Sequence, residues 1–122
     1  MTDNITHHAF FGDRRHAFTL TDEMVTELEQ STQVALGALY VAFSGYAVPV
    51  NVMRDIIRLG LIGAGTAPEA AKRLTDTYAV NRPIGELFPL AFAILDARWN
   101  GTQPETEAAA TGDLGASLRV VA

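Results

Sequence analysis

Apolar residues recur every three or four positions in five separate stretches of this chain, and that spacing predicts five amphipathic helices. The expected helices begin after Thr21, at about Gln33, after Asn51, at Pro68 and at Asn81. The second is expected to end at Phe43, the fourth at about Tyr78 and the fifth at Gly101. The pattern therefore predicts a mainly α fold, a small helical bundle of about five helices.

The N-terminal part of the chain has a different pattern, with two short aromatic runs on either side of a turn sequence. Residues 8–11 and 16–20 flank residues 12–15, whose sequence is GDRR. This arrangement predicts a short β-hairpin over about residues 8–20. Residues 1–7 are expected to be frayed.

Polar and glycine residues mark where individual helices should start and stop. Thr21 is the expected N-cap of the first helix. Gly63 and Gly65 are expected to adopt the left-handed backbone that ends a helix. Thr66 and Glu69 then stand in capping-box register and predict the start of the fourth helix.

Three residues within the expected helices carry predictions of their own. Gly60 lies on the apolar stripe of the third helix, where its lack of a side chain would let another element pack closely. Pro68 falls in a first helical turn, where its missing amide costs little. Pro89 falls inside the fifth helix and predicts a kink or a local break.

The composition changes after Gly101, where apolar residues lose any helical period. Residues 1–101 are therefore expected to form a single helical domain, and residues 102–122 a flexible, solvated C-terminal tail. The run at residues 118–122, LRVVA, is apolar enough to dock on another surface.

Composition narrows the classes of function. The chain has no cysteine, which excludes disulfides and thiolate metal sites and fits a reducing cytoplasm. Its formal net charge is −5, without an acidic or basic block, so it should repel polyanions unless its few cations cluster. No signal peptide is visible. These features fit a cytoplasmic protein.

One uncharged stretch, residues 30–53, is long enough to raise the question of a membrane span. Ser44, Gly45 and Pro49 interrupt it, so a buried core helix is the favoured interpretation and no membrane contact is expected.

The residues that could carry chemistry do not form a catalytic pattern. His7, His8 and His16 could approach one another across a hairpin and hold zinc, but ordinary surface histidines are the favoured interpretation. Close acidic pairs fall at helix surfaces, and no serine sits in a nucleophile elbow. We therefore expect no enzyme activity, no cofactor and no metal.

A nucleic-acid interface is a weaker alternative. The third and fourth helices could mimic a helix-turn-helix, with cations on both. Because the whole chain is acidic and Glu69 sits at the tip that would meet bases, no nucleic-acid partner is expected. The cations in question are Arg54, Arg58, Lys72 and Arg73.

Several blocks of sequence, in the same order, resemble the gene transfer agent family of small phage-tail proteins. They are residues 12–15 (GDRR), 18–21 (FTLT), 27–29 (ELE), 37–40 (GALY), 57–65 (IRLGLIGAG), 68–71 (PEAA), 82–87 (RPIGEL), 89–91 (PLA) and 94–95 (IL). The resemblance covers roughly residues 10–101, and its most specific block is residues 57–65. A departure is Ala64, where the family often has glycine.

The resemblance implies a phage tail assembly chaperone. Such a protein is not an enzyme and binds the tape-measure protein before tail-tube subunits polymerise around it, inside the producing bacterial cell. The tail tube protein is a second expected partner, and a homo-oligomer is compatible with the resemblance. The alternative is a minor structural component of the tail or head-tail connector that is retained in the particle.

Apolar residues outside the main stripes suggest where a partner would bind. Leu59, Ile62 and Phe92 are expected to form an exposed patch, with Phe10 and Phe11 as further members. An amphipathic helix of the partner would dock in it. The expected rim of this patch is Arg54 and Arg58.

Overall fold

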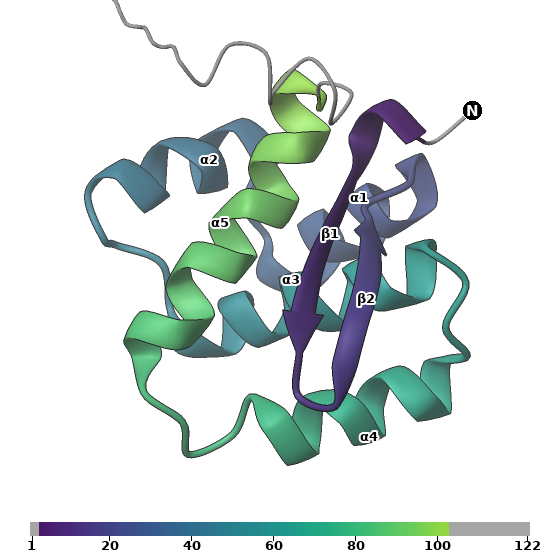
Figure 1. Cartoon of the computed structure of the whole chain (residues 1–122). Helices are drawn as coiled ribbons and strands as arrows, with labels where there is room; N and C mark the ends of the chain where they lie inside the picture. Colours follow the sequence, from purple (N-terminus) through teal and green to yellow (C-terminus); the bar gives the residue numbers. More distant parts are fainter. Residues whose placement is uncertain (1–2, 103–122) are drawn as a thin grey trace, which may run out of the picture.

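The computed structural model describes residues 3–102, and these residues form five α-helices and one β-hairpin (Figure 1). The elements are a 3₁₀ turn at Asp3–Ile5, β1 (Thr6–Phe11), β2 (Arg14–Thr19), α1 (Asp22–Thr32), α2 (Leu36–Ser44), α3 (Val50–Gly63), α4 (Pro68–Tyr78) and α5 (Ile84–Asn100). The predicted mainly α bundle with an N-terminal hairpin is confirmed. The predicted tail lies outside the described residues, apart from Thr102.

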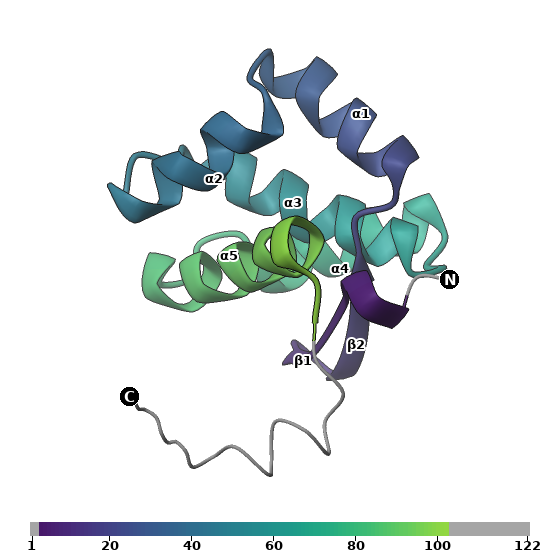
Figure 2. The same ribbon diagram turned by 90° about the horizontal axis from the view of Figure 1, so that it is seen from above.

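Helix α3 is the centre of the fold and packs against β2, α1, α4 and α5. Seen from above, α1 and α2 lie on one side, the hairpin on the opposite side, and α3 and α5 between them (Figure 2). Half of α3's fourteen residues are buried, including Ile56, Ile57 and Leu61, which are fully inaccessible to solvent. Burial of this many aliphatic side chains in one element makes α3 the main source of hydrophobic stabilisation.

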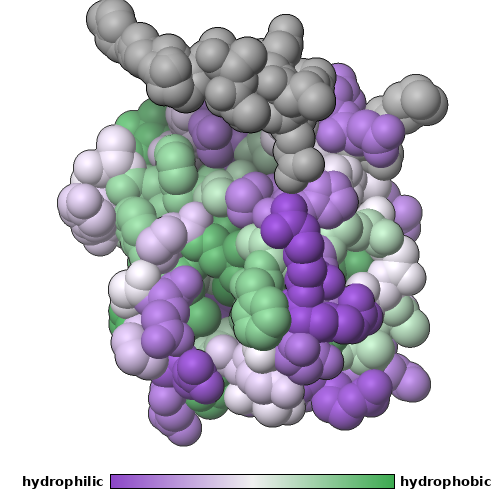
Figure 3. All heavy atoms as spheres, viewed as in Figure 1, coloured by the Kyte–Doolittle hydropathy of each residue, from purple (hydrophilic) through white to green (hydrophobic). Residues whose placement is uncertain are grey.

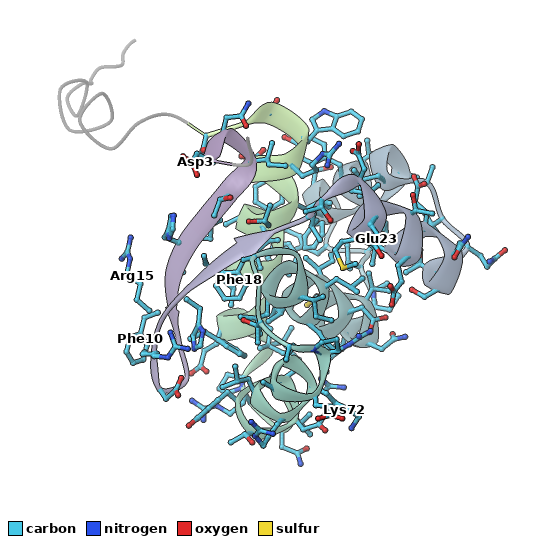
Figure 4. The ribbon with its side chains drawn as sticks, turned by 90° about the vertical axis from the view of Figure 1, so that its right-hand side faces the viewer. Asp3, Phe10, Arg15, Phe18, Glu23 and Lys72 are labelled. Carbon is cyan, nitrogen blue, oxygen red and sulfur yellow. The ribbon has the colours of Figure 1, made fainter. Side chains whose placement is uncertain are left out.

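The hairpin covers the core with one face and shows the other to solvent. Phe18 is fully buried and lies opposite His7, whereas Phe10 and Arg15 pair on the outer face. Figure 4 shows Phe10 and Arg15 projecting away from the body of the protein. The hairpin begins earlier than predicted, because the hydroxyl oxygens of Thr6 and Thr19 lie 2.7 Å apart and join the strand ends.

The expectation of a frayed start was therefore wrong for residues 3–7. Residues 3–5 form the 3₁₀ turn, and the amide of Thr102 donates to the carbonyl of Asn4 at 2.8 Å. The end of the described chain is thus held against its beginning, a contact that no local sequence pattern could reveal.

The helix-end signals were only partly right. The hydroxyl of Thr21 caps α1 by accepting from the amide of Met24 at 3.3 Å, as predicted. Gly65 has a φ of +114°, also as predicted, but Gly63 is the last residue of α3 and is not left-handed. The capping box was wrong, because α4 begins after Ala67 and no side chain caps it. Pro68 occupies the first turn as expected.

Gly63 is instead needed for close packing between elements. A Cβ at this position would overlap the carbonyl oxygen of Thr19 at the end of β2. Gly60, one turn earlier, is buried as predicted, and a Cβ there would lie 3.1 Å from the Cβ of Phe18. The two glycines together let β2 lie directly on α3.

Helix α5 runs without interruption through Pro89, so the predicted local break is excluded. The hydrogen bond that Pro89 cannot donate would have gone to the carbonyl of Gly85, one turn earlier. Gly85 is exposed, so water can satisfy that carbonyl. Gly101 ends the helix with a φ of +83°.

The uncharged stretch at residues 30–53 is divided among the end of α1, all of α2 and the start of α3. Within the part of the chain that the structure describes, no helix is both long enough and apolar enough to cross a bilayer.

Candidate partner-binding surfaces

The residues of the patch predicted from the sequence do not form one exposed surface. Leu59 is fully buried, while Ile62 and Phe92 are half-buried and pack against the core. The exposure expected for Leu59 was therefore wrong. Because α3 has neighbours on several sides, residues off its main stripe are buried as well. Phe11 is also in the core, and of the five residues only Phe10 is largely exposed.

The two arginines expected to rim that patch are engaged elsewhere. The Nε of Arg54 donates to the carbonyl of Ala79 at 2.9 Å, which ties α3 to the end of α4. An Nη of Arg58 lies 3.5 Å from a carboxylate oxygen of Asp55. Both side chains line a hollow of about 570 Å³ between α3 and α4, together with Glu69.

The cations considered for nucleic-acid binding do not form one basic face. Lys72 pairs with Asp76 at 2.7 Å beside Arg54 and Arg58, and acids alternate with cations in that hollow. Arg73 lines a different hollow with Arg14. The arrangement lacks the continuous positive stripe that phosphate contacts need.

The three histidines do not converge either. His16 is 96 % buried rather than surface-exposed as expected, and its Nε2 lies 3.0 Å from the Oδ1 of Asp13. This hydrogen bond is the main reason why the pKa of the Asp13 carboxyl is lowered. Burial, aided by the charges of His8 and Arg15, lowers the pKa of His7. Among residues 3–102 no three His, Asp or Glu side chains lie close enough together to hold a metal ion.

A surface that the sequence analysis missed lies along the seam between α2 and α5. Figure 3 shows hydrophobic residues gathered over these two helices. Six aromatic rings form a continuous chain there, with neighbouring ring centroids 5.0–5.7 Å apart. We call this the α2–α5 aromatic surface, made of Tyr40, Phe43, Tyr46, Phe88, Phe92 and Trp99.

Much of this surface faces solvent. Tyr46 is 80 % exposed and Trp99 51 % exposed. Two aliphatic residues on the same helices, Val41 at 67 % and Ile84 at 42 %, are also open to solvent. Beneath Tyr46, the side chains of Val48, Met53 and Phe88, among others, line an apolar hollow of about 350 Å³.

Hydrogen bonds to Tyr40, and stacking of Trp99 on it, fix the orientation of these two rings. The hydroxyl of Tyr40 donates to Asp96 at 2.8 Å, which raises the pKa of Tyr40, and Asn100 donates to the same hydroxyl at 2.9 Å. Trp99 stacks on Tyr40 and reaches across to α2, where the Cβ missing from Gly37 would lie 3.2 Å from its ring. The signal available in the sequence was the helical spacing of the aromatic residues within each helix.

A second hollow, of about 580 Å³, lies between β1 and the first half of α5. Ala9, Leu87, Pro89 and Leu90 are among the residues that give it apolar walls, and Phe10 stands at its edge with 68 % of its surface exposed. Hydrophobic residues are visible at the centre of the face in Figure 3, between α5 and β1. We call this hollow the β1–α5 groove.

Comparison with known families identifies what kind of protein carries these surfaces. The family described as phage tail tube protein, GTA-gp10, matches residues 4–101, which is nearly all of the described domain. The chain belongs to this phage-tail family. The relation to gene transfer agent and phage-tail proteins inferred from the sequence blocks is thereby confirmed. No curated protein and no solved structure matches the chain.

Proposed function

We propose that this GTA-gp10 family member is a non-enzymatic tail assembly chaperone that binds an apolar helix of the tape-measure protein. The observation that carries the proposal is the exposed α2–α5 aromatic surface. Large exposed aromatic residues on a small domain are typical of a protein-binding site, since tyrosine and tryptophan supply much of the binding energy at interfaces.

The chemistry of the surface favours an apolar helical partner. Helix α2 has no charged residue, and the chain has no lysine or arginine between Arg15 and Arg54. A partner helix could place its apolar stripe along the seam without burying an unpaired charge. Because Trp99 is already stacked on Tyr40, and the hydroxyl of Tyr40 is already hydrogen-bonded to Asp96, little side-chain entropy is lost on binding.

This mode of binding suits a chaperone. Covering an apolar segment keeps it from aggregating, and the tail tube protein can then displace the chaperone as it polymerises around the same segment. The protein would act in the cytoplasm of the producing bacterial cell, with no cofactor and no metal. The second candidate is a structural tail component retained in the particle, which the family's description as a tail tube protein favours.

Co-purification with the tape-measure protein tests the proposal. Val41→Asp combined with Tyr46→Asn changes two largely exposed positions, and asparagine tolerates the left-handed backbone of Tyr46, whose φ is 56°. We expect this double variant to keep its helical circular dichroism and to lose the tape-measure protein. Phe10→Ser, at a similarly exposed residue on the hairpin, is the matched control and should bind normally.

Two outcomes would count against parts of the proposal. Normal binding by the folded double variant would show that the α2–α5 aromatic surface is not the docking site. Mass spectrometry of purified particles separates the two candidate functions, because a chaperone should be absent and a structural component present at a fixed stoichiometry.

A further inference from the structure

One face of the molecule carries both a projecting aromatic side chain and an apolar hollow. Phe10 stands at the edge of the β1–α5 groove with 68 % of its surface exposed. Figure 4 shows it projecting on the side that faces the viewer in Figure 3, where the groove is seen. The groove, of about 580 Å³, has room for a phenylalanine side chain of another molecule. An aromatic residue that fills an apolar pocket is a common anchor of protein–protein contacts.

The neighbouring contacts hold Phe10 in place at this edge. Phe11, the next residue, is buried, and its ring meets that of Tyr78 edge-on with centroids 6.0 Å apart. The turn at Gly12 lies against the same ring, because a Cβ at Gly12 would overlap it. Since the chain is anchored on α4 directly after Phe10, little backbone freedom is lost when Phe10 docks.

The distribution of charge favours a second copy of the chain as the occupant. Helix α1 has four acidic residues and no basic one, and it lies on the side opposite the hairpin (Figure 2). The groove is lined by one cation, Arg82, and one acid, Glu86, which pair at 3.4 Å. Burial lowers the pKa of His7, the remaining titratable group at the groove's β1 wall, and keeps it largely uncharged at pH 7. Two copies of this acidic chain that meet groove to groove therefore keep their α1 helices apart.

We propose that two copies of this chain form a dimer in which Phe10 of each copy enters the β1–α5 groove of the other. Because the side chain and the groove lie on one face, a two-fold axis between them brings each ring to the opposite groove. Such a contact is closed and stops at two copies. The six rings of the α2–α5 aromatic surface do not line this groove, so the dimer is independent of the proposed binding of the tape-measure protein.

Light scattering of the purified full chain during size-exclusion chromatography measures the association. We expect the native chain to be dimeric at about 0.1 mM and Phe10→Ser to be monomeric. Both inserted rings are lost from each dimer, which raises the dissociation constant by at least about a hundredfold. Val41→Asp changes a similarly exposed apolar residue on α2, is the matched control and should stay dimeric. A native chain that is monomeric at this concentration, or a dimeric Phe10→Ser variant, would overturn the proposal.

Mixing two variants distinguishes insertion of Phe10 from any other self-contact. Phe10→Ser keeps the groove, whereas Leu90→Glu keeps Phe10 and places a charge in the groove. Each should be monomeric alone, and the equimolar mixture should associate about tenfold or more tightly than either variant, because one ring can enter one intact groove. Should Leu90→Glu alter the circular dichroism, Pro89→Glu, at an exposed position of the same groove, takes its place. A mixture that associates no better than its components would overturn the insertion.

Discussion

At the scale of single residues, two glycines decide how closely the hairpin approaches the central helix. Gly60 and Gly63 lie one turn apart on α3, and β2 occupies the space that their side chains would fill. Neither glycine has a φ that requires glycine, so their role is steric. A change at either position therefore acts on packing between elements and leaves the local backbone preference satisfied.

We expect Gly60→Leu to lower the free energy of unfolding by about 1–3 kcal/mol. The added side chain would start 3.1 Å from the Cβ of Phe18 and 3.3 Å from the Cγ2 of Ile94, where there is no room for it. Denaturant unfolding followed by circular dichroism measures the change.

The same substitution at Gly85 is the control. Gly85 is exposed on α5, and nothing lies within 4 Å of the position its Cβ would take. Gly85→Leu should therefore keep or raise the stability, by up to about 1 kcal/mol, through better helix propensity. A loss of stability of the same size in both variants would contradict the packing explanation for Gly60.

At the scale of secondary-structure elements, features set by residues close together in the sequence could be predicted. Features set by packing against distant segments of the chain could not. The helices were found because each buries a stripe at helical spacing. The cap at Thr21 was found because its hydroxyl reaches an amide only three residues away. Gly63 was misassigned, because β2, which excludes a side chain there, is distant along the chain.

The two threonines expected to cap helices provide a direct comparison. We expect Thr21→Ala to cost about 1 kcal/mol, since it removes the hydrogen bond to the amide of Met24 at the start of α1. Thr66→Ala should change stability by less than about 0.5 kcal/mol, because α4 begins after Ala67 and has no side-chain cap. Thermal unfolding of the two variants measures the difference, and equal losses would show that Thr66 supports α4 in some other way.

At the scale of the whole molecule, the candidate binding surface could not be predicted because exposure depends on every neighbour of a helix at once. Leu59 and Ile62 looked unpartnered along the sequence, yet α3 is surrounded and buries Leu59 completely. No sequence pattern singled out Trp99, which is half exposed and stacked on Tyr40. Apolar residues left open at the seam of two packed helices become visible only once the packing is known.

The α2–α5 aromatic surface and the β1–α5 groove border different sides of α5, and one natural probe distinguishes them. Trp99 is the single tryptophan of the chain and belongs to the aromatic surface. Binding of the tape-measure protein there should move its fluorescence emission to shorter wavelength and protect it from quenching by acrylamide, because the ring loses contact with water. A tryptophan-free variant of the tape-measure protein would make Trp99 the only source of signal. Unchanged emission in a complex that co-purifies would place the partner away from Trp99 and would overturn the proposed docking site.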